Sequence, residues 1–259
     1  MRFCVLGSGS GGNSTLVECG GTTLLIDAGF SGVEITRRLN KIGRRPEQLS
    51  AILVTHEHND HVSGVGIMSR RCGLPVYANG ATHEAASSRV RKLAAYREFT
   101  TGEGFAVGKL AIHPFAISHD TADPVGFTIS DGSSVFGYCT DTGKVTQLMR
   151  HHLGRCHGLV LEANHDPQML RDGPYPLPLK QRVGSGQGHL ANPDTARLIR
   201  DLQGDRLAHV VLAHLSDTNN APELAFRAVR NGLDPQRRLP EISLARQDGP
   251  GVVVELGKR

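Results

Sequence analysis

The chain has 259 residues, of which 39% are hydrophobic and 21% charged, and its formal net charge is +4. This length supports one large domain or two small ones, and no run of about 18 apolar residues occurs, which excludes a transmembrane helix. The amino terminus lacks the apolar length of a signal peptide and the five cysteines form no C-x-x-C pair, so we expect a cytoplasmic protein without a disulfide framework.

The first hundred residues are predicted to alternate strands with helices. Short apolar runs bounded by turn residues predict strands at residues 2–6, 15–18, 23–27, 51–55 and 75–78. Helical periodicity predicts helices at residues 31–42, 63–71 and 81–95. Ser31 is expected to be the N-cap of the first helix.

The rest of the chain continues this alternation. Strands are predicted at residues 104–107, 110–115, 125–130, 134–139, 158–162 and 209–213, and a closing hairpin at 241–245 and 252–256. Helices are predicted at residues 146–153, 192–202 and 221–231, with Asn192 as an N-cap, whereas the proline-rich segment 166–183 is expected to be irregular. Because the sequence shows no repeat or linker, we expect a single domain, residues 1–259, built from two packed sheets with helices outside.

A dense cluster of metal-binding side chains follows the predicted strand 51–55. Residues 56–61 read His-Glu-His-Asn-Asp-His, and the donors among them are His56, His58, Asp60 and His61. A strand end would present the first two on one face, and a turn would bring the other two to a second point nearby. This arrangement suits two metal ions that activate water against phosphoesters or acyl groups. A histidine-rich surface loop is the alternative interpretation.

Three further donors each follow an apolar strand, where rigid backbone can place a ligand accurately. They are His119, Asp141 and His214. We expect one ion to be held by His56, His58 and His119, and the other by Asp60, His61 and His214. Asp141 would bridge the two ions through its two oxygens. A water between them would become a metal-activated hydroxide near neutral pH.

Several motifs, taken together, resemble those of the metallo-β-lactamase superfamily. They are Leu-Leu-Ile-Asp-Ala-Gly at residues 24–29, Thr-His-Glu-His-Asn-Asp-His at 55–61, His119, Thr-Asp-Thr-Gly at 140–143 and Leu-Ala-His-Leu-Ser at 212–216. The resemblance implies an α/β fold, the αβ/βα sandwich of two mixed sheets flanked by helices, with a dinuclear site at one edge. It also implies that Asp27 hydrogen-bonds a ligand histidine and fixes its tautomer.

Two residues favour a phosphodiester substrate. Glu162 ends a predicted strand and His189 precedes a predicted helix, an order that resembles the tRNase Z branch. There, the glutamate orients a histidine that protonates the leaving oxygen, an effect worth roughly 100- to 10,000-fold in rate. His165 is the alternative proton donor.

The whole chain is most similar to the YycJ/WalJ family of bacterial metallo-hydrolases. The motifs that carry this similarity lie at residues 7–14, 118–127, 162–166, 180–182 and 188–192. The resemblance implies a DNA exonuclease that acts from the 5′ end. Substrate contacts are expected from Ser10 and Asn13 in the glycine-serine loop, from His165, and from Lys180 and Arg182.

Two other functions remain open at this stage. One is a small-molecule hydrolase of the same fold, either a cyclic phosphodiesterase or a thioesterase. The other is a non-catalytic nucleic-acid-binding module, although structural metal sites rarely keep two ions and an open water position. Zinc or manganese suits the expected ligands and iron is compatible with them. Self-association as a homodimer is also left open.

Overall fold

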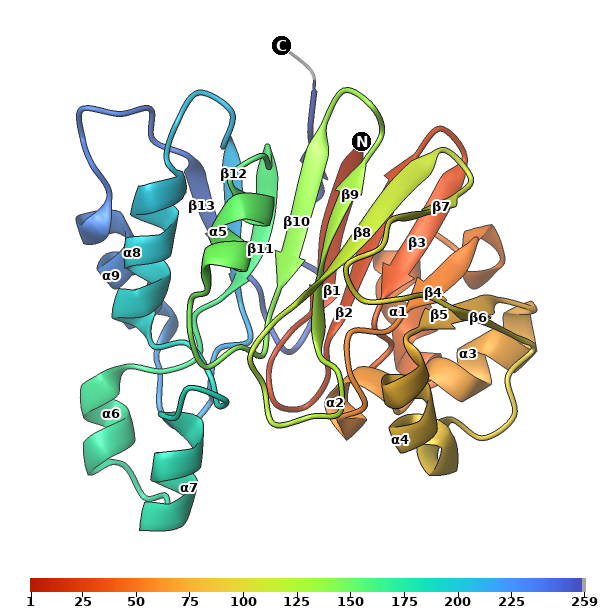
Figure 1. Ribbon diagram of the computed structural model, residues 1–259, viewed down its shortest axis with the longest axis horizontal. Coiled ribbons are helices and arrows are strands. Elements are labelled where there is room, and N and C mark those ends of the chain that lie inside the picture. Colours follow the sequence, from red (N-terminus) through yellow and green to blue (C-terminus); the bar gives the residue numbers. More distant parts are fainter. Residues whose placement is uncertain (258–259) are drawn as a thin grey trace.

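The computed structural model describes residues 1–257 as two seven-stranded sheets packed face to face, with helices on the outer side of each sheet (Figure 1). The first half contains β1 (Arg2–Gly7), β2 (Ser14–Cys19), β3 (Thr22–Ile26), α1 (Gly32–Lys41), η1 (Pro46–Gln48), β4 (Ala51–Leu53), α2 (Asn59–Val62), α3 (Val65–Cys72), β5 (Pro75–Ala78), α4 (Gly80–Val90) and β6 (Ala95–Glu98). This arrangement confirms the predicted sandwich.

The second half repeats the same order of elements. It contains β7 (Phe105–Val107), β8 (Leu110–Ala116), β9 (Val125–Ser130), β10 (Val135–Cys139), α5 (Gln147–Leu153), β11 (Gly158–Glu162), α6 (Pro167–Asp172), α7 (Leu177–Val183), α8 (Asn192–Leu202), β12 (His209–Ala213), α9 (Pro222–Gly232), β13 (Glu241–Leu244) and β14 (Val254–Glu255). In each half, three antiparallel pairings are followed by three parallel ones, across β14-β1-β2-β3-β4-β5-β6 and β7-β8-β9-β10-β11-β12-β13. The halves share topology although the sequence shows no repeat.

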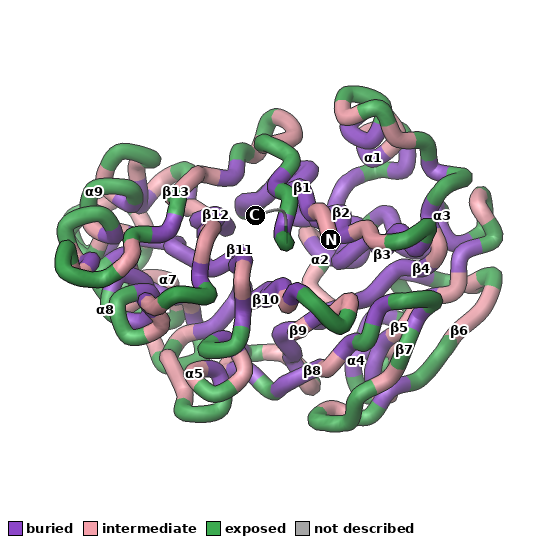
Figure 2. Tube along the Cα trace, turned by 90° about the horizontal axis from the view of Figure 1, so that it is seen from above, coloured by how far each residue is buried: buried purple, intermediate pink, exposed green. Residues whose placement is uncertain are grey.

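The core consists of three apolar layers. Alternation along β1 shows how they arise: Phe3 and Val5 belong to the layer between the sheets, whereas Cys4 and Leu6 belong to the layer under the helices of the first half. Phe3 meets Phe136 of the second sheet with ring centroids 4.5 Å apart. Burial of each such side chain contributes roughly 1.5–3 kcal/mol. Figure 2 shows the buried segments gathered along the strands between the two helical layers.

Local helix signals were correct in one place and wrong in another. The Ser31 hydroxyl accepts a hydrogen bond of 3.2 Å from the Glu34 amide and caps α1, as predicted. The N-cap of α8 is Ala191, not Asn192. The Asn192 side chain is buried and instead donates to the amide oxygen of Asn220, which is also buried, at 2.9 Å.

Three other predictions of secondary structure were also wrong. The helix predicted at 81–95 ends at Val90, and residues 95–98 form the edge strand β6, paired with β5. The proline-rich segment is not irregular but forms α6 and α7, each with proline in its first turn, where a missing N–H has no cost. The closing hairpin does not form, since β13 pairs with β12 in one sheet and β14 with β1 in the other.

No helix within residues 1–257 is long and apolar enough to cross a membrane.

Candidate metal centre

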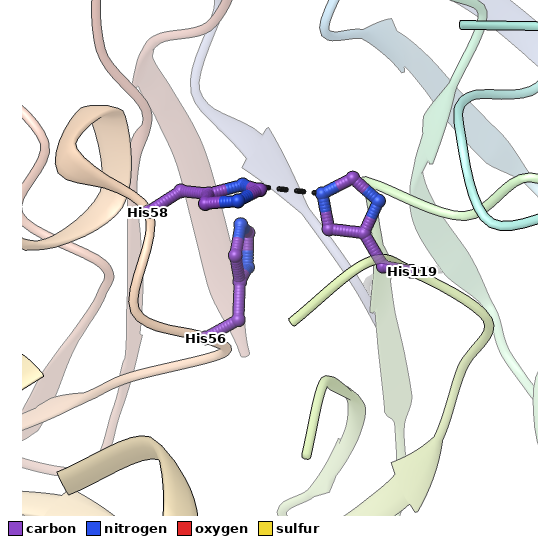
Figure 3. A group of neighbouring side chains, drawn as sticks. All are labelled: His56, His58 and His119. Atoms are coloured by element: carbon purple, nitrogen blue, oxygen red, sulfur yellow. Dashed lines mark hydrogen bonds between the residues drawn. The ribbon is translucent and has the colours of Figure 1, made fainter. Parts of the chain in front are cut away.

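Three histidines from two separate loops face one another at one end of the sheets. His56 and His58 lie between β4 and α2, and His119 follows β8 (Figure 3). His119 Nε2 lies 3.2 Å from His58 Nδ1. One nitrogen from each of the three rings lies within 4.8 Å of the others, so a single metal ion could contact all three.

A second group lies beside the first and shares Asp141 with it. Asp60, His61 and His214 likewise place one donor atom each within 4.8 Å of one another. Asp141 Oδ2 lies 3.3 Å from His61 Nε2, and its Oδ1 lies 3.5 Å from His214 Nε2 and 3.9 Å from His119 Nε2. The carboxylate therefore faces both groups, at the position expected for a bridging ligand.

In four of the five expected histidine ligands Nδ1 has its own partner, which leaves Nε2 to face the centre, whereas His58 presents Nδ1 to His119 Nε2. His61 Nδ1 lies 2.8 Å from the buried Asp27 carboxylate, which also accepts bonds from the Thr55 amide and hydroxyl. His56 Nδ1 lies 3.0 Å from the Thr55 hydroxyl. The Gly188 carbonyl lies 3.1 Å from His119 Nδ1. Asp27 thus has the contact that the resemblance implied.

Buried polar atoms without partners test whether these residues suit a metal. His56 Nε2, Asp141 Oδ2 and His214 Nε2 are buried and form no hydrogen bond. An unsatisfied buried polar atom costs about 1–3 kcal/mol, so three in one cluster need a common explanation. Divalent cations provide it, because imidazole nitrogens and carboxylate oxygens are their usual ligands. The residues fit a divalent metal centre.

The backbone is strained where it delivers these side chains. Asp27, Asp141 and His214 have φ of 57°, 58° and 55°, in the left-handed region that non-glycine residues seldom adopt. Asp27 and His214 directly follow β3 and β12, and Asp141 lies two residues after β10. The reversal at each strand end turns the side chain toward the centre, and such strain gathers at functional sites.

The charges of the centre balance one another within the protein. Burial would raise the pKa of Asp141, but His214 and His61 hold it well below its usual range. Burial would lower the pKa of His214, yet the nearby carboxylates of Asp141, Asp60 and Glu162 raise it to about 10. The pKa of His61 is likewise raised well above its usual range, against burial, by Asp141 and Asp27. Without metal, the centre is therefore a network of buried ion pairs.

Glu162 connects the centre to His189. Its Oε1 lies 2.8 Å from His189 Nδ1 and 2.9 Å from His214 Nδ1, and its Oε2 accepts the Leu190 amide at 3.0 Å. Burial would raise the pKa of Glu162, but His189 and His214 lower it to about 2. The ionised Glu162 carboxylate thus holds two rings: that of the expected proton donor His189 and that of the expected metal ligand His214.

A cavity of about 230 Å³ opens onto the centre. Its lining residues are Ser10, His58, Asp60, Asp120, Asp141, Tyr175, Leu179, Arg182, Val183, Gly188, His189 and His214. A larger cavity of about 720 Å³ lies beside the β2–β3 turn. We place the chemistry in the smaller one, because each cluster of metal donors found in residues 1–257 contributes at least one residue to its lining.

Some predicted substrate contacts lie outside this cavity. Asn13 is fully buried, and its Nδ2 lies 3.2 Å from Asp60 Oδ2, so it supports a ligand where a substrate cannot reach. His165 is buried and pairs through its backbone with Ala191. The Lys180 ammonium donates to the Arg171 carbonyl at 2.7 Å, away from the cavity. Ser10 and Arg182 do line it.

Sequence reasoning missed several lining residues, among them Asp120 and Tyr175. Asp120 accepts a hydrogen bond of 2.6 Å from Arg182 Nε, and its position directly after His119 could have indicated it. Tyr175 lies in the proline-rich segment, and the expectation of an irregular segment hid it.

Comparisons with known proteins agree with this geometry. Residues 22–215 match the β-lactamase superfamily domain. The chain is 40% identical to exodeoxyribonuclease WalJ of Streptococcus pneumoniae, over 90% of this chain and 88% of the relative. It is 36% identical to exodeoxyribonuclease YycJ of Bacillus anthracis, over 90% and 89%. The crystal structure of the metallo-β-lactamase fold protein YhfI from Bacillus subtilis superposes with a TM-score of 0.77 at 18% identity, covering 98% of this chain and 99% of that one.

The match to the superfamily domain and the two near full-length relatives show the family. The chain belongs to the β-lactamase superfamily of metal-dependent hydrolases and, within it, to the family of the WalJ and YycJ proteins.

Proposed function

We propose that this protein is a DNA exonuclease that removes nucleotides from the 5′ end with the help of two divalent metal ions. One observation carries the proposal: His189, whose Nδ1 lies 2.8 Å from the buried Glu162 carboxylate, lines the same cavity as several of the metal donors. Thioester hydrolysis has less need of such a proton donor, whereas an alkoxide leaving group requires it. The relatives named exodeoxyribonucleases support the choice of DNA.

Two ions would be held as the donor groups suggest, one by His56, His58 and His119, the other by Asp60, His61 and His214, with Asp141 between them. Zinc or manganese suits this set, and iron is compatible with it. When bound, such ions lower the pKa of water and stabilise negative charge on a phosphate. Asn13 and Asp27 orient this donor set from behind, through Asp60 and His61.

His189 supplies the proton for the leaving oxygen. Its Nδ1 is committed to Glu162, so Nε2 is the nitrogen left for the substrate. Proton transfer becomes easier because the Glu162 carboxylate holds the ring in place. We expect this step to contribute roughly 100- to 10,000-fold in rate.

The cavity suits one nucleotide rather than a duplex. Its volume of about 230 Å³ is below the roughly 300–1,000 Å³ of sites that enclose drug-sized ligands. A strand end can enter it, while the middle of a paired strand cannot. The Ser10 hydroxyl and the Arg182 guanidinium are placed to contact phosphate at its mouth.

The test uses a 5′-phosphorylated DNA duplex labelled at its 3′ end, with zinc-loaded and manganese-loaded protein assayed separately. Digestion from the 5′ end gives progressively shorter labelled fragments, whereas digestion from the 3′ end releases the label at once. Asp141→Ala should abolish the reaction and His189→Ala should slow it by at least about 100-fold. His165→Ala is the matched control and should keep a rate close to wild type, provided that its unfolding temperature is unchanged.

Immediate release of the label would overturn the 5′ polarity. Absence of DNA cleavage with either metal, together with turnover of a cyclic nucleotide or a thioester, would move the function to small-molecule hydrolysis and leave the metal centre unaffected.

A further inference from the structure

The proline-rich segment forms a strap, defined here as residues 167–183, which comprises α6 and α7. It is inserted between β11 and α8 and lies at the same end of the molecule as α2 (Figure 1). Helix α7 contributes no buried residue, although it carries Leu177, Leu179 and Val183. The apolar side chains of α7 are therefore not part of the core, in contrast to Leu170 of α6, which is buried.

Part of the strap forms one wall of the catalytic cavity. Tyr175, Leu179 and Val183 line it together with a set of polar residues that includes Asp60 and Asp141. The metal donors and His189 account for the polar residues, but hydrolysis of a phosphodiester gives no reason for the apolar ones. An aromatic ring and two aliphatic side chains, partly exposed beside a charged centre, indicate a ligand with a flat apolar face.

The strap is fixed relative to the centre. Arg182 Nε donates to the Asp120 carboxylate at 2.6 Å, and Asp120 directly follows the expected ligand His119. Just beyond the end of the strap, the Ser118 hydroxyl donates to the Gly186 carbonyl at 2.7 Å. Prolines at residues 174, 176 and 178 restrict the backbone around Tyr175. The backbone that carries the ring is thus restricted before a substrate arrives, which reduces the entropy lost on binding.

We propose that Tyr175, supported by Leu179, is a stacking platform for the base of the terminal nucleotide whose phosphodiester lies at the metal centre. This inference rests on the proposed nuclease function and narrows its substrate to nucleotides that carry a base. The phenol ring can stack on any of the four bases, so the platform gives no sequence preference. It favours a strand end over a small phosphodiester without a base.

The test compares two substrates, a DNA strand with a normal 5′-terminal nucleotide and the same strand with an abasic tetrahydrofuran residue at that position. Tyr175→Ala should raise KM for the normal strand by roughly 5- to 150-fold, the range that corresponds to loss of one base–aromatic stack, with kcat little changed. Wild type on the abasic strand should show a similar loss. The variant should lose nothing further on that strand.

Two variants control for structural effects. Tyr175→Trp keeps a stacking surface and should retain the wild-type KM. Leu177→Ala changes a strap residue whose side chain is 66% exposed and which does not line the cavity, so both substrates should behave as with wild type.

An equal loss on normal and abasic strands in Tyr175→Ala would overturn the platform, because the residue would then act through the phosphate or the fold. Cleavage of both strands by wild type with equal KM would do the same while leaving the nuclease intact. Failure of wild type to cleave either strand would remove the proposed function and this inference with it.

Discussion

The connection from β4 to α3 and the connection from β11 to α8 occupy the same place in the two halves, yet they differ in length and content. The first carries four metal donors within residues 56–61. The second carries the strap and His189. One half therefore concentrates the metal-binding groups, and the other holds the groups expected to handle the nucleotide. A repeated topology allowed this division, since each connection can change without disturbing the sheets.

The same contrast between the two halves holds for two single residues, Asp27 and Asp141. They follow the corresponding strands β3 and β10, and both have left-handed backbone with φ of 57° and 58°. Asp27 lies behind His61 at 2.8 Å, whereas Asp141 faces the expected metals. The same backbone position thus supports a ligand in one half and supplies one in the other. Five measurements test these assignments.

Replacement of Asp141 should have the largest effect on activity. Asp141→Asn should reduce activity to background and lower the metal content, because both donor groups share this carboxylate. Metal content by mass spectrometry and DNA cleavage measure the outcome. Asn at this position also tolerates the left-handed backbone, so the fold should be retained. Full metal occupancy and activity in this variant would refute the bridging role.

Glu162→Gln should have the second largest effect. The carboxylate holds both His189 and His214, so we expect kcat to fall by roughly 100- to 10,000-fold. The pH profile of kcat should also change its shape in the variant, because His189 loses its charged partner. A loss in metal affinity alone, with kcat restored at saturating metal, would show that Glu162 serves only His214.

Asp27→Asn should have a smaller effect than Glu162→Gln. Asp27 touches only one expected ligand ring, His61, so metal affinity should fall by about 10- to 100-fold. Activity should recover when the metal concentration is raised, and metal titration followed by activity checks this. Activity that stays low at saturating metal would place Asp27 closer to the chemistry than its burial allows.

Metal loading should release about two protons at pH 7, one each from His61 and His214. Both have raised pKa, that of His214 to about 10, so both are protonated at this pH without metal. Metal affinity should therefore rise with pH. The stability that the raised pKa of His214 gives the metal-free protein is fully present below about 6.5 and is lost as pH rises through about 10. Calorimetry in buffers of different ionisation enthalpy counts the protons, and a count of zero would contradict these protonation states.

Glu34→Gln, far from the centre, should have the smallest effect. Arg37 and Arg38 lower the pKa of Glu34 from 4.5 to about 2, with burial opposing them. Its ion pairs stabilise the protein above about pH 4.5, and this stability is lost as pH falls toward 2. We expect about 1 kcal/mol or less, because the pair is partly exposed to solvent. Urea unfolding at pH 7 and at pH 3 should show a larger difference between variant and wild type at pH 7 than at pH 3.

The sequence predicted the fold and the donor set better than it predicted the cavity. The expected ligands could be located because each follows an apolar strand, and these strands bring their ends to one side of the sandwich. The repeated topology could not be predicted from the sequence, because it depends on the order in which strands pair rather than on residue identity. Tyr175 was missed because proline density was interpreted as irregular backbone, although proline in a first turn is compatible with a helix. Asn13 and His165 were misplaced because burial cannot be inferred from a loop motif.

The left-handed backbone at Asp27, Asp141 and His214 creates a conflict between thermal stability and activity. Strained residues of this kind cost about 1–3 kcal/mol each, and glycine would adopt the same conformation freely. Selection for heat resistance alone would therefore favour glycine at these three positions and discard the catalyst in the process. Any programme of thermostabilisation for this enzyme has to select for turnover at every round.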